Sequence, residues 1–354
     1  MKAVLVSLRF NPGHLSHLIA NHKLLKESGF AVSLRINPLF IDLAENRSLK
    51  DDFSGSYVPG LRRADLFIVW FPSVGALLEM LRVRVSSDAT IVYVNHEPYT
   101  SIRSYRESGF GVRKSVRIAL VGLVGSLLAW LSHKVILPSA RALVRFEETN
   151  YLKKPCAKIN LMFDDESTPQ LLESKRLYVS YIGTIAEDHA FDDFVRFMDY
   201  VSNSSIGGDV RFLIATKSDI PPDCLSTIER CERRGTVKVV CGAPLSNTEI
   251  NRHFSSSLVV WNAYRRSMQS GVLAKAYMFG TPVLTSAASP SEFFVANVTG
   301  QQISADYDPS EILAAIETIS RNFNAYSVAC RRYFLEHFYY SSLKRSFLDF
   351  VTSP

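Results

Sequence analysis

The residues best suited to bind a phosphate group lie in the second half of the chain. Segment 262–272 contains Arg265, Arg266 and the small pair Ser270 and Gly271, and it lies between two apolar runs. The predicted order is strand, polar loop, short helix, strand. This order brings backbone N–H groups and a helix N-terminus to the carboxyl end of a buried strand, where α/β proteins bind phosphate. The segment therefore predicts a diphosphate site, and the alternative is an ordinary β-α-β turn with solvated arginines.

A second candidate site lies in the first half, where the strand predicted over 90–98 ends in Asn95-His96-Glu97. Polar neighbours favour a place for His96 in a site rather than in a core, because an imidazole can share hydrogen bonds or carry protons. Glu97 could contact an acceptor, although a solvated loop carboxylate explains it as well. No His, Cys or Asp cluster has metal-ligand spacing, and no GxSxG turn is present. These patterns predict neither a zinc site nor a serine hydrolase.

Length and charge narrow the class of protein. At 354 residues, 47% of them hydrophobic, the chain is expected to form two globular domains. The net charge is +6, and many of the cations fall within residues 103–145, which favours an anionic partner. Because no nucleic-acid-binding motif accompanies them, we expect a membrane surface and no nucleic acid. Five cysteines without a CxxC pair indicate reduced thiols in a cytoplasmic protein, and we expect no secretory signal.

One uncharged segment, Ile118–Ser132, is apolar enough to suggest contact with a membrane. At about 15 residues it is shorter than the roughly 20 that a membrane span needs, so we exclude a span. A buried helix is the first expectation. A helix lying partly in a membrane interface is the alternative, because Trp130 and the preceding cations Arg113, Lys114 and Arg117 suit that place.

The chain alternates between apolar strands and amphipathic helices, a pattern that predicts parallel sheets covered on both faces. The pattern breaks at the polar segment 164–169 and restarts at Leu177. We therefore predict an N-terminal domain over 1–165 and a C-terminal domain over 166–325. The aromatic-rich helical segment 326–354 is expected to pack back across the joint onto the first domain.

Five motifs in the second half, in order, are Tyr181-Ile182-Gly183-Thr184-Ile185, Phe212-Leu213-Ile214-Ala215-Thr216-Lys217, Val240-Cys241-Gly242-Ala243-Pro244, Tyr264-Arg265 with Gln269-Ser270-Gly271-Val272, and Phe279-Gly280-Thr281-Pro282-Val283. This order resembles the nucleotide-sugar domain of GT-B fold glycosyltransferases, most of all family 4 and its bacterial surface-polysaccharide members. In the first half, segments 92–97 and 135–139 resemble the acceptor-domain strands of that family.

The resemblance implies an α/β GT-B fold, with two Rossmann-like domains that face each other across a cleft. It implies a retaining, hexosyltransferase-type transfer from a nucleoside diphosphate sugar to a lipid-linked or polysaccharide acceptor in bacterial surface-polysaccharide biosynthesis. No cofactor and no bound metal are expected, because helix N-termini and backbone N–H groups can stabilise the departing diphosphate. The expected location is the cytoplasm, peripherally on the inner face of the plasma membrane.

The resemblance also suggests site residues. His96 stands near the place where the family has a histidine beside the donor sugar, which makes it the candidate catalytic residue. Ser270, Gly271 and Val272 match the backbone that contacts phosphate. The remaining donor-binding candidates are Gly13, Lys217, Ala243, Pro244, Tyr264, Arg265, Gln269 and Lys275.

The sequence departs from the family pattern in two places. Ser267 and Lys275 align with two glutamates of the family, and the loop Ala186–His189 carries two acids where the family has a basic pair. These departures leave open a non-catalytic GT-B protein that binds a partner or a polysaccharide. A nucleotide-sugar epimerase is a weaker alternative, because no pair of acids is placed for that chemistry.

Overall fold

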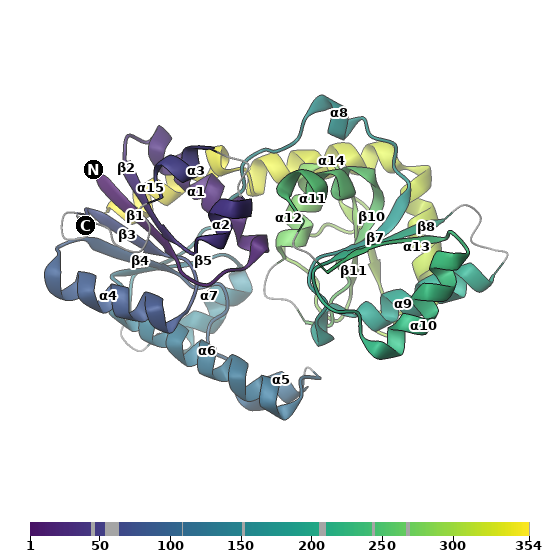
Figure 1. Cartoon of the computed structure of the whole chain (residues 1–354), viewed down its shortest axis with the longest axis horizontal. Helices are drawn as coiled ribbons and strands as arrows, with labels where there is room; N and C mark the ends of the chain where they lie inside the picture. The colour runs from purple at the N-terminus through teal and green to yellow at the C-terminus, as the bar shows by residue number, and fades with distance from the viewer. Residues whose placement is uncertain are drawn as a thin grey trace. The chain divides into compact units, whose positions relative to one another are not determined.

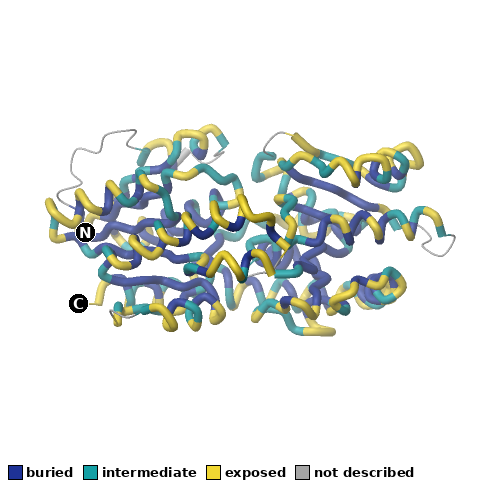
Figure 2. Tube along the Cα trace, turned by 90° about the horizontal axis from the view of Figure 1, so that it is seen from below, coloured by how far each residue is buried: buried dark blue, intermediate teal, exposed yellow. Residues whose placement is uncertain are grey.

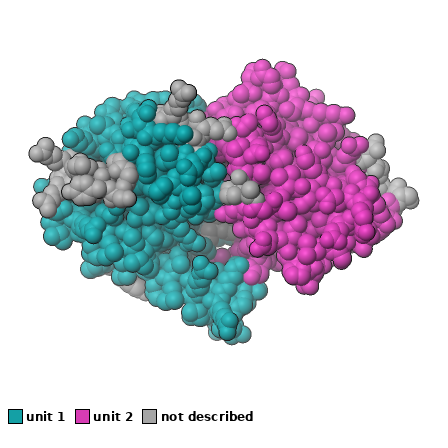
Figure 3. All heavy atoms as spheres, in the orientation of Figure 1, with its two compact units in different colours: residues 1–164, 337–354 teal, residues 165–336 magenta. Residues whose placement is uncertain are grey.

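The computed structural model describes the chain over residues 1–43, 47–53, 64–107, 109–150, 153–204, 210–242, 245–266 and 270–353, with the backbone alone at residues 47 and 48. The chain divides into two compact units (Figures 1 and 3). Unit 1 consists of Met1–Asp164 and His337–Pro354, and unit 2 of Asp165–Glu336.

Unit 1 is built on a six-stranded parallel sheet of order β2-β1-β3-β4-β5-β6. Its strands read as short apolar runs because helices cover both faces of the sheet. The strands are β1 (Lys2–Ser7), β2 (Ala31–Ile36), β3 (Leu66–Val69), β4 (Thr90–Val94), β5 (Lys134–Leu137) and β6 (Cys156–Lys158). The helices are η1 (Pro12–His14), α1 (Leu15–Glu27), α2 (Leu39–Leu43), α3 (Arg47–Asp51), α4 (Val74–Ser86), α5 (Ile102–Glu107), α6 (Val112–Leu131), α7 (Ala140–Glu147) and α15 (Tyr340–Thr352).

Helices α4, α6 and α7 lie side by side on one face of this sheet (Figure 1). The strands they connect follow one another across the sheet in one direction, and right-handed crossovers then place all three helices on the same face. Their inner side chains share one core with the strands, including Met80 of α4, Leu128 of α6 and Phe146 of α7. On the other face, α1 packs against α15.

Unit 2 repeats this architecture with a parallel sheet of order β12-β11-β10-β7-β8-β9. Its strands are β7 (Tyr178–Ile182), β8 (Arg211–Thr216), β9 (Val237–Cys241), β10 (Ser257–Trp261), β11 (Val283–Ser286) and β12 (Gly300–Ile303). Its helices are α8 (Pro169–Leu172), η3 (Glu187–His189), α9 (Phe191–Asn203), α10 (Pro222–Arg233), α11 (Asn247–Ser256), α12 (Gly271–Met278), α13 (Pro309–Arg321) and α14 (Phe323–His337). Phe194 and Phe197 of α9 are fully buried against the sheet, one helical turn apart.

Two predicted segments differ from the structure. The helical segment predicted over 326–354 is two helices, and its first part belongs to unit 2, where Arg331 donates a hydrogen bond to the Met278 carbonyl. The apolar helix predicted over Ile118–Ser132 is α6, which is 20 residues long, and only 33% of its most apolar window is buried. The first expectation, a buried helix, is therefore wrong, because the sequence did not show which side of the helix meets the sheet.

Candidate functional site

The candidate site residues of unit 1 gather where β1, β3 and β4 end. The turn Asn11–His14 follows β1, Trp70 and Phe71 follow β3, and Asn95 and His96 follow β4. Because parallel strands end at the same edge of a sheet, these three segments are neighbours. The ring of Phe71 stacks on His14 at 3.4 Å and on His96 at 4.3 Å between centroids.

His96 is partly buried in this aromatic group, in contact with Trp70 and Phe71. Burial, and to a smaller extent the neighbouring His17, holds the pKa of His96 well below its usual 6.5. The imidazole is therefore neutral at pH 7. A neutral imidazole can share a hydrogen bond with a sugar hydroxyl, but it does not supply positive charge to a diphosphate.

Gly13 is the donor-binding residue predicted in the turn after β1. Gly13 lies in the η1 turn, where its N–H donates to the Asn11 side chain at 3.3 Å. A Cβ at this position would meet only the Asn11 Oδ1 atom, at 3.7 Å. Space within the chain therefore does not explain the glycine.

In unit 2, the ends of β7 and β10 meet the N-terminus of α12. Gly183 directly follows β7 with φ of +129°, a backbone conformation that residues other than glycine rarely adopt. A Cβ at Gly183 would lie 3.4 Å from the Val272 Cγ2 atom in the first turn of α12. The strand end and the helix N-terminus therefore approach each other closely here, as in a phosphate-binding turn.

Ser270 fixes the start of α12. Its hydroxyl accepts a hydrogen bond from the Leu273 N–H at 3.2 Å and donates to the Asn262 side chain at 2.5 Å. Ser270 is therefore the N-cap of α12 and also ties this helix to the loop after β10. Helix N-termini carry partial positive charge and N–H groups without a partner inside the helix, so the end of α12 at Ser270, Gly271 and Val272 is chemically suited to an anion.

Tyr264 lies in the same loop and stacks on His189, with 4.2 Å between the ring centroids. Burial raises the pKa of the Tyr264 hydroxyl far above its usual 10, so this group stays protonated. Lys217 is exposed directly after β8, beside β7 in the sheet. Ala243, Pro244 and Gln269 of the predicted donor-binding set lie outside the described residues, as does Ser267.

The guanidinium of Arg265 binds acidic groups of its own unit. It contacts Asp192 at 2.7 Å, also Asp193, and the Glu187 carbonyl at 2.9 Å. The structure therefore pairs Arg265 with the acidic segment around η3, which would otherwise repel a diphosphate. Its charge offsets that segment rather than projecting toward a ligand.

Lys275 is buried and likewise paired. Its ammonium contacts the Glu166 carboxylate at 2.7 Å and the Asn251 side chain at 2.9 Å. The family resemblance expects a glutamate at position 275, and the structure instead holds a lysine against a carboxylate from the segment before α8. Sequence reasoning missed this pair because 109 residues separate its members.

Sequence reasoning also left Gly183 out of the predicted site. Its signal was available, since a glycine directly after a buried strand is typical of a turn that approaches a ligand. The described residues contain no group of three or more His, Cys, Asp or Glu side chains arranged to hold a metal ion.

No family model matches this sequence, and no curated protein matches it. Solved structures do. The first is HepE of Anabaena in complex with UDP-glucose, with a TM-score of 0.72 at 13% identity over 100% of both chains. A glycosyltransferase of Rickettsia africae follows with a TM-score of 0.69 at 12% identity, over 99% of this chain and 97% of that one. Sucrose-phosphate synthase of Thermosynechococcus elongatus has a TM-score of 0.68 at 13% identity, over 98% of this chain and 97% of that one.

The chain has the GT-B fold. The fold class predicted from the sequence is thereby confirmed, with two Rossmann-like parallel sheets of six strands each. In this GT-B chain, the described candidates Gly13 and His96 lie at the carboxyl edge of the sheet of unit 1. The carboxyl edge of the sheet of unit 2 carries Lys217, Tyr264 and Ser270.

Proposed function

We propose that this GT-B chain is a retaining glycosyltransferase. It would move a hexose from a nucleoside diphosphate sugar to a hydroxyl of a lipid-linked or polysaccharide acceptor, in the synthesis of a bacterial surface polysaccharide. The observation that carries the proposal is the N-terminus of α12, where Ser270, Gly271 and Val272 lie beside Gly183 at the end of β7.

This arrangement suits a diphosphate leaving group. Negative charge builds up on the diphosphate as the bond to the sugar breaks, and prearranged N–H donors stabilise that charge. The first N–H groups of a helix have no partner within the helix, and the helix dipole adds to their effect. The proposed reaction therefore requires no metal.

The donor to test first is a UDP-sugar. HepE, which shares this fold, has been solved with UDP-glucose, with UDP, and with UDP and glucose. We assign binding of the nucleoside diphosphate to unit 2, and we propose His96 of unit 1, with its neutral imidazole, as the catalytic residue.

A second candidate function is a non-catalytic GT-B protein that binds a partner or a polysaccharide. The pairing of Arg265 with Asp192 and Asp193, and of Lys275 with Glu166, favours it, because two expected cations are already neutralised. The two functions differ in whether a nucleotide sugar binds and is turned over.

The first experiment measures donor binding by calorimetry and slow donor hydrolysis across UDP-, GDP- and dTDP-sugars, in the presence of a chelator. We expect one nucleotide class to bind and to be hydrolysed. Gly271→Asp should weaken that binding at least about tenfold, or ~1.4 kcal/mol, because a carboxylate then faces the diphosphate. The same change should leave the fold intact, since an acid in the first turn of a helix is stabilising.

The matched control is Ala140→Asp, which places an acid at the first position of α7, another eight-residue helix with a serine N-cap. It should leave donor binding unchanged. Absence of binding for every donor would contradict the transferase, and binding without hydrolysis or transfer would support the non-catalytic protein. The anomeric configuration of the product, read by NMR, tests retention.

A further inference from the structure

Helix α6 turns several large apolar side chains away from the protein. Six of them are 38–57% exposed: Val112, Val116, Leu120, Leu123, Leu127 and Trp130. At 3.6 residues per turn, these positions fall within one arc of about 80°. A soluble helix normally buries such a stripe, so the outer side of α6 is an apolar surface without a described cover.

Apart from Leu128, the fully buried residues of α6 are small. Gly122 approaches Tyr99 so closely that an added Cβ would lie 3.2 Å from its ring, and at Gly125 the Tyr93 hydroxyl would be 3.1 Å away. Ser115, Ala119 and Ala129 are buried on the same side. The close approach of α6 to the protein is thus made mainly through small side chains, while six large apolar ones remain exposed.

Helix α4 continues this surface. It packs against α6 on the same face of the sheet, and Val74, Leu78, Leu81 and Val85 are 41–87% exposed. Their spacing of three and four residues places them on one side of the helix. Figure 2 views the chain from the side on which α4, α5 and α6 lie in Figure 1, and exposed residues recur along this side. We call these ten side chains of α4 and α6 the α4–α6 apolar surface.

Cations gather at the end of the α4–α6 apolar surface that α5 and the first turns of α6 form. Arg113, Lys114 and Arg117 are exposed in the first turns of α6, and Arg103 and Arg106 are exposed on α5, which packs on α6. Across the described residues of α5 and α6 the only carboxylate is Glu107, which pairs with Arg103 at 2.9 Å. This end of the surface therefore carries net positive charge, which matches an anionic lipid headgroup layer.

We propose that the α4–α6 apolar surface docks in the plane of an anionic membrane, with its side chains among the acyl chains and the cations of α5 and α6 on phosphate headgroups. Apolar burial and a basic patch together give stable attachment, whereas one signal alone gives marginal binding. Trp130 lies at the C-terminal end of the stripe, and indole rings favour the headgroup level. The proposal does not depend on the proposed transferase activity.

The geometry of unit 1 argues against two other uses of this surface. By length and composition α6 could cross a membrane, with a mean hydropathy of 1.6. However, its Leu128 and Ala129 belong to the same core as the strands, so a span would expose the sheet. Docking of a second copy would bring two positively charged ends together, and like charges then oppose the contact.

The test is co-sedimentation of the full chain with vesicles of phosphatidylcholine alone and of phosphatidylcholine mixed with phosphatidylglycerol. We expect binding to the mixed vesicles that is at least about tenfold stronger than to neutral ones, and weaker at high salt. The double variant Leu123→Glu, Leu127→Glu should lose this binding. Val328→Glu, at a 71% exposed apolar position in α14, is the matched control and should keep it.

Charge reversal tests the contribution of the cations to membrane binding. Arg113→Glu with Arg117→Glu should abolish the preference for anionic vesicles, whereas Arg321→Glu with Arg345→Glu, at positions 71% and 94% exposed, should not. Failure of the wild-type chain to bind mixed vesicles would overturn the proposal. So would attachment that alkaline carbonate does not release, which indicates a span, or a dimer that Leu123→Glu, Leu127→Glu dissociates, which indicates a second copy.

Discussion

Among the single residues of the site, His96 has the clearest electrostatic signature. Its pKa lies well below 6.5, so an unfolded chain binds a proton at this histidine when the folded chain does not. Unit 1 must therefore lose stability as the pH falls below about 6.5. Relative to His96→Gln, which does not titrate, we expect the wild type to lose up to ~1.4 kcal/mol for each pH unit below that point. Denaturant unfolding of both proteins between pH 7 and pH 5 measures this difference, and parallel curves would contradict it.

The types of the site residues could be predicted from the sequence, but their partners could not. Strand periodicity placed His96 and Ser270 at strand and helix ends, because the local pattern determines these ends. The carboxylates of Asp192 and Asp193 lie more than 70 residues before Arg265, and only the tertiary fold brings them to its guanidinium. A cation in a loop therefore predicts a binding site poorly until its neighbours are known.

At the level of elements, Ser270 caps the N-terminus of α12 and ties it to the loop after β10. Ser270→Ala removes the N-cap and the contact to Asn262, so we expect unit 2 to lose about 1 kcal/mol of stability. Nucleotide affinity should fall as well, since the helix N-terminus is no longer tied to the loop after β10. Ser270→Thr keeps a hydroxyl cap and is the matched control. Denaturant unfolding measures the stability of both variants, and calorimetry measures their nucleotide affinity. Equal stability and equal affinity of the two variants would refute the role of the hydroxyl.

Helix α6 shows where prediction at this scale ends. Its apolar composition and its flanking cations are evident in the sequence, and they predict a helix at this place. Which side faces outward depends on how closely Gly122 and Gly125 approach Tyr99 and Tyr93, and that approach is a property of the packed sheet. The sequence alone therefore favoured burial for a helix that the structure leaves largely exposed.

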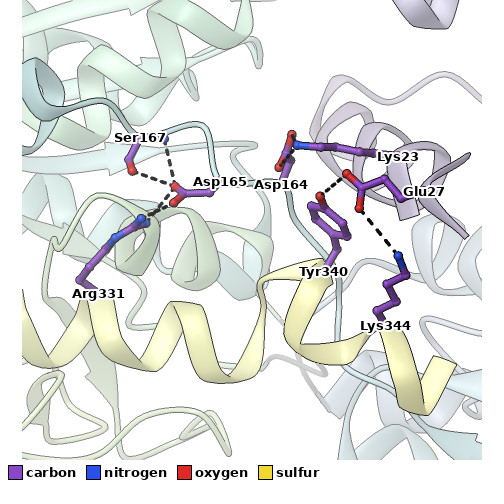
Figure 4. Close-up of polar contacts among 8 residues, drawn as sticks. All are labelled: Lys23, Glu27, Asp164, Asp165, Ser167, Arg331, Tyr340 and Lys344. Atoms are coloured by element: carbon purple, nitrogen blue, oxygen red, sulfur yellow. Dashed lines mark hydrogen bonds and ion pairs between the residues drawn. The ribbon is translucent and has the colours of Figure 1, made fainter. Parts of the chain in front are cut away.

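At the scale of the whole molecule, the chain passes twice between its units, at Asp164–Asp165 and at Glu336–His337. Polar contacts within unit 1 hold the residues on one side of these passages, and polar contacts within unit 2 hold those on the other side (Figure 4). In unit 1, Lys23 contacts Asp164 at 3.0 Å and the Tyr340 hydroxyl donates to Glu27 at 2.9 Å. In unit 2, Arg331 of α14 binds Asp165 with both terminal nitrogens.

The two neighbouring aspartates at the first passage should therefore stabilise different units. Burial raises the pKa of Asp165, but hydrogen bonds from Arg331 and Ser167 outweigh it and hold that pKa below its usual 3.8. A lowered carboxyl pKa stabilises the folded state above about pH 4, and this contribution fades as the carboxylate is protonated below that pH. Asp165→Asn should thus cost unit 2 about 1–3 kcal/mol at pH 7, because the Arg331 charge loses its partner, and this cost should shrink as the pH falls below about 4.

Asp164→Asn is the matched control at the adjacent position. Lys23 is 42% exposed, so its loss of a partner should cost unit 1 no more than about 1 kcal/mol. Hydrogen exchange resolves the two effects, because Asp165→Asn should speed exchange in α12 and α14 and leave α1 and α15 as they were. If Asp165→Asn sped hydrogen exchange equally in both units, the stabilities of the two units would be coupled. The prediction that Asp164 and Asp165 stabilise different units would then be wrong.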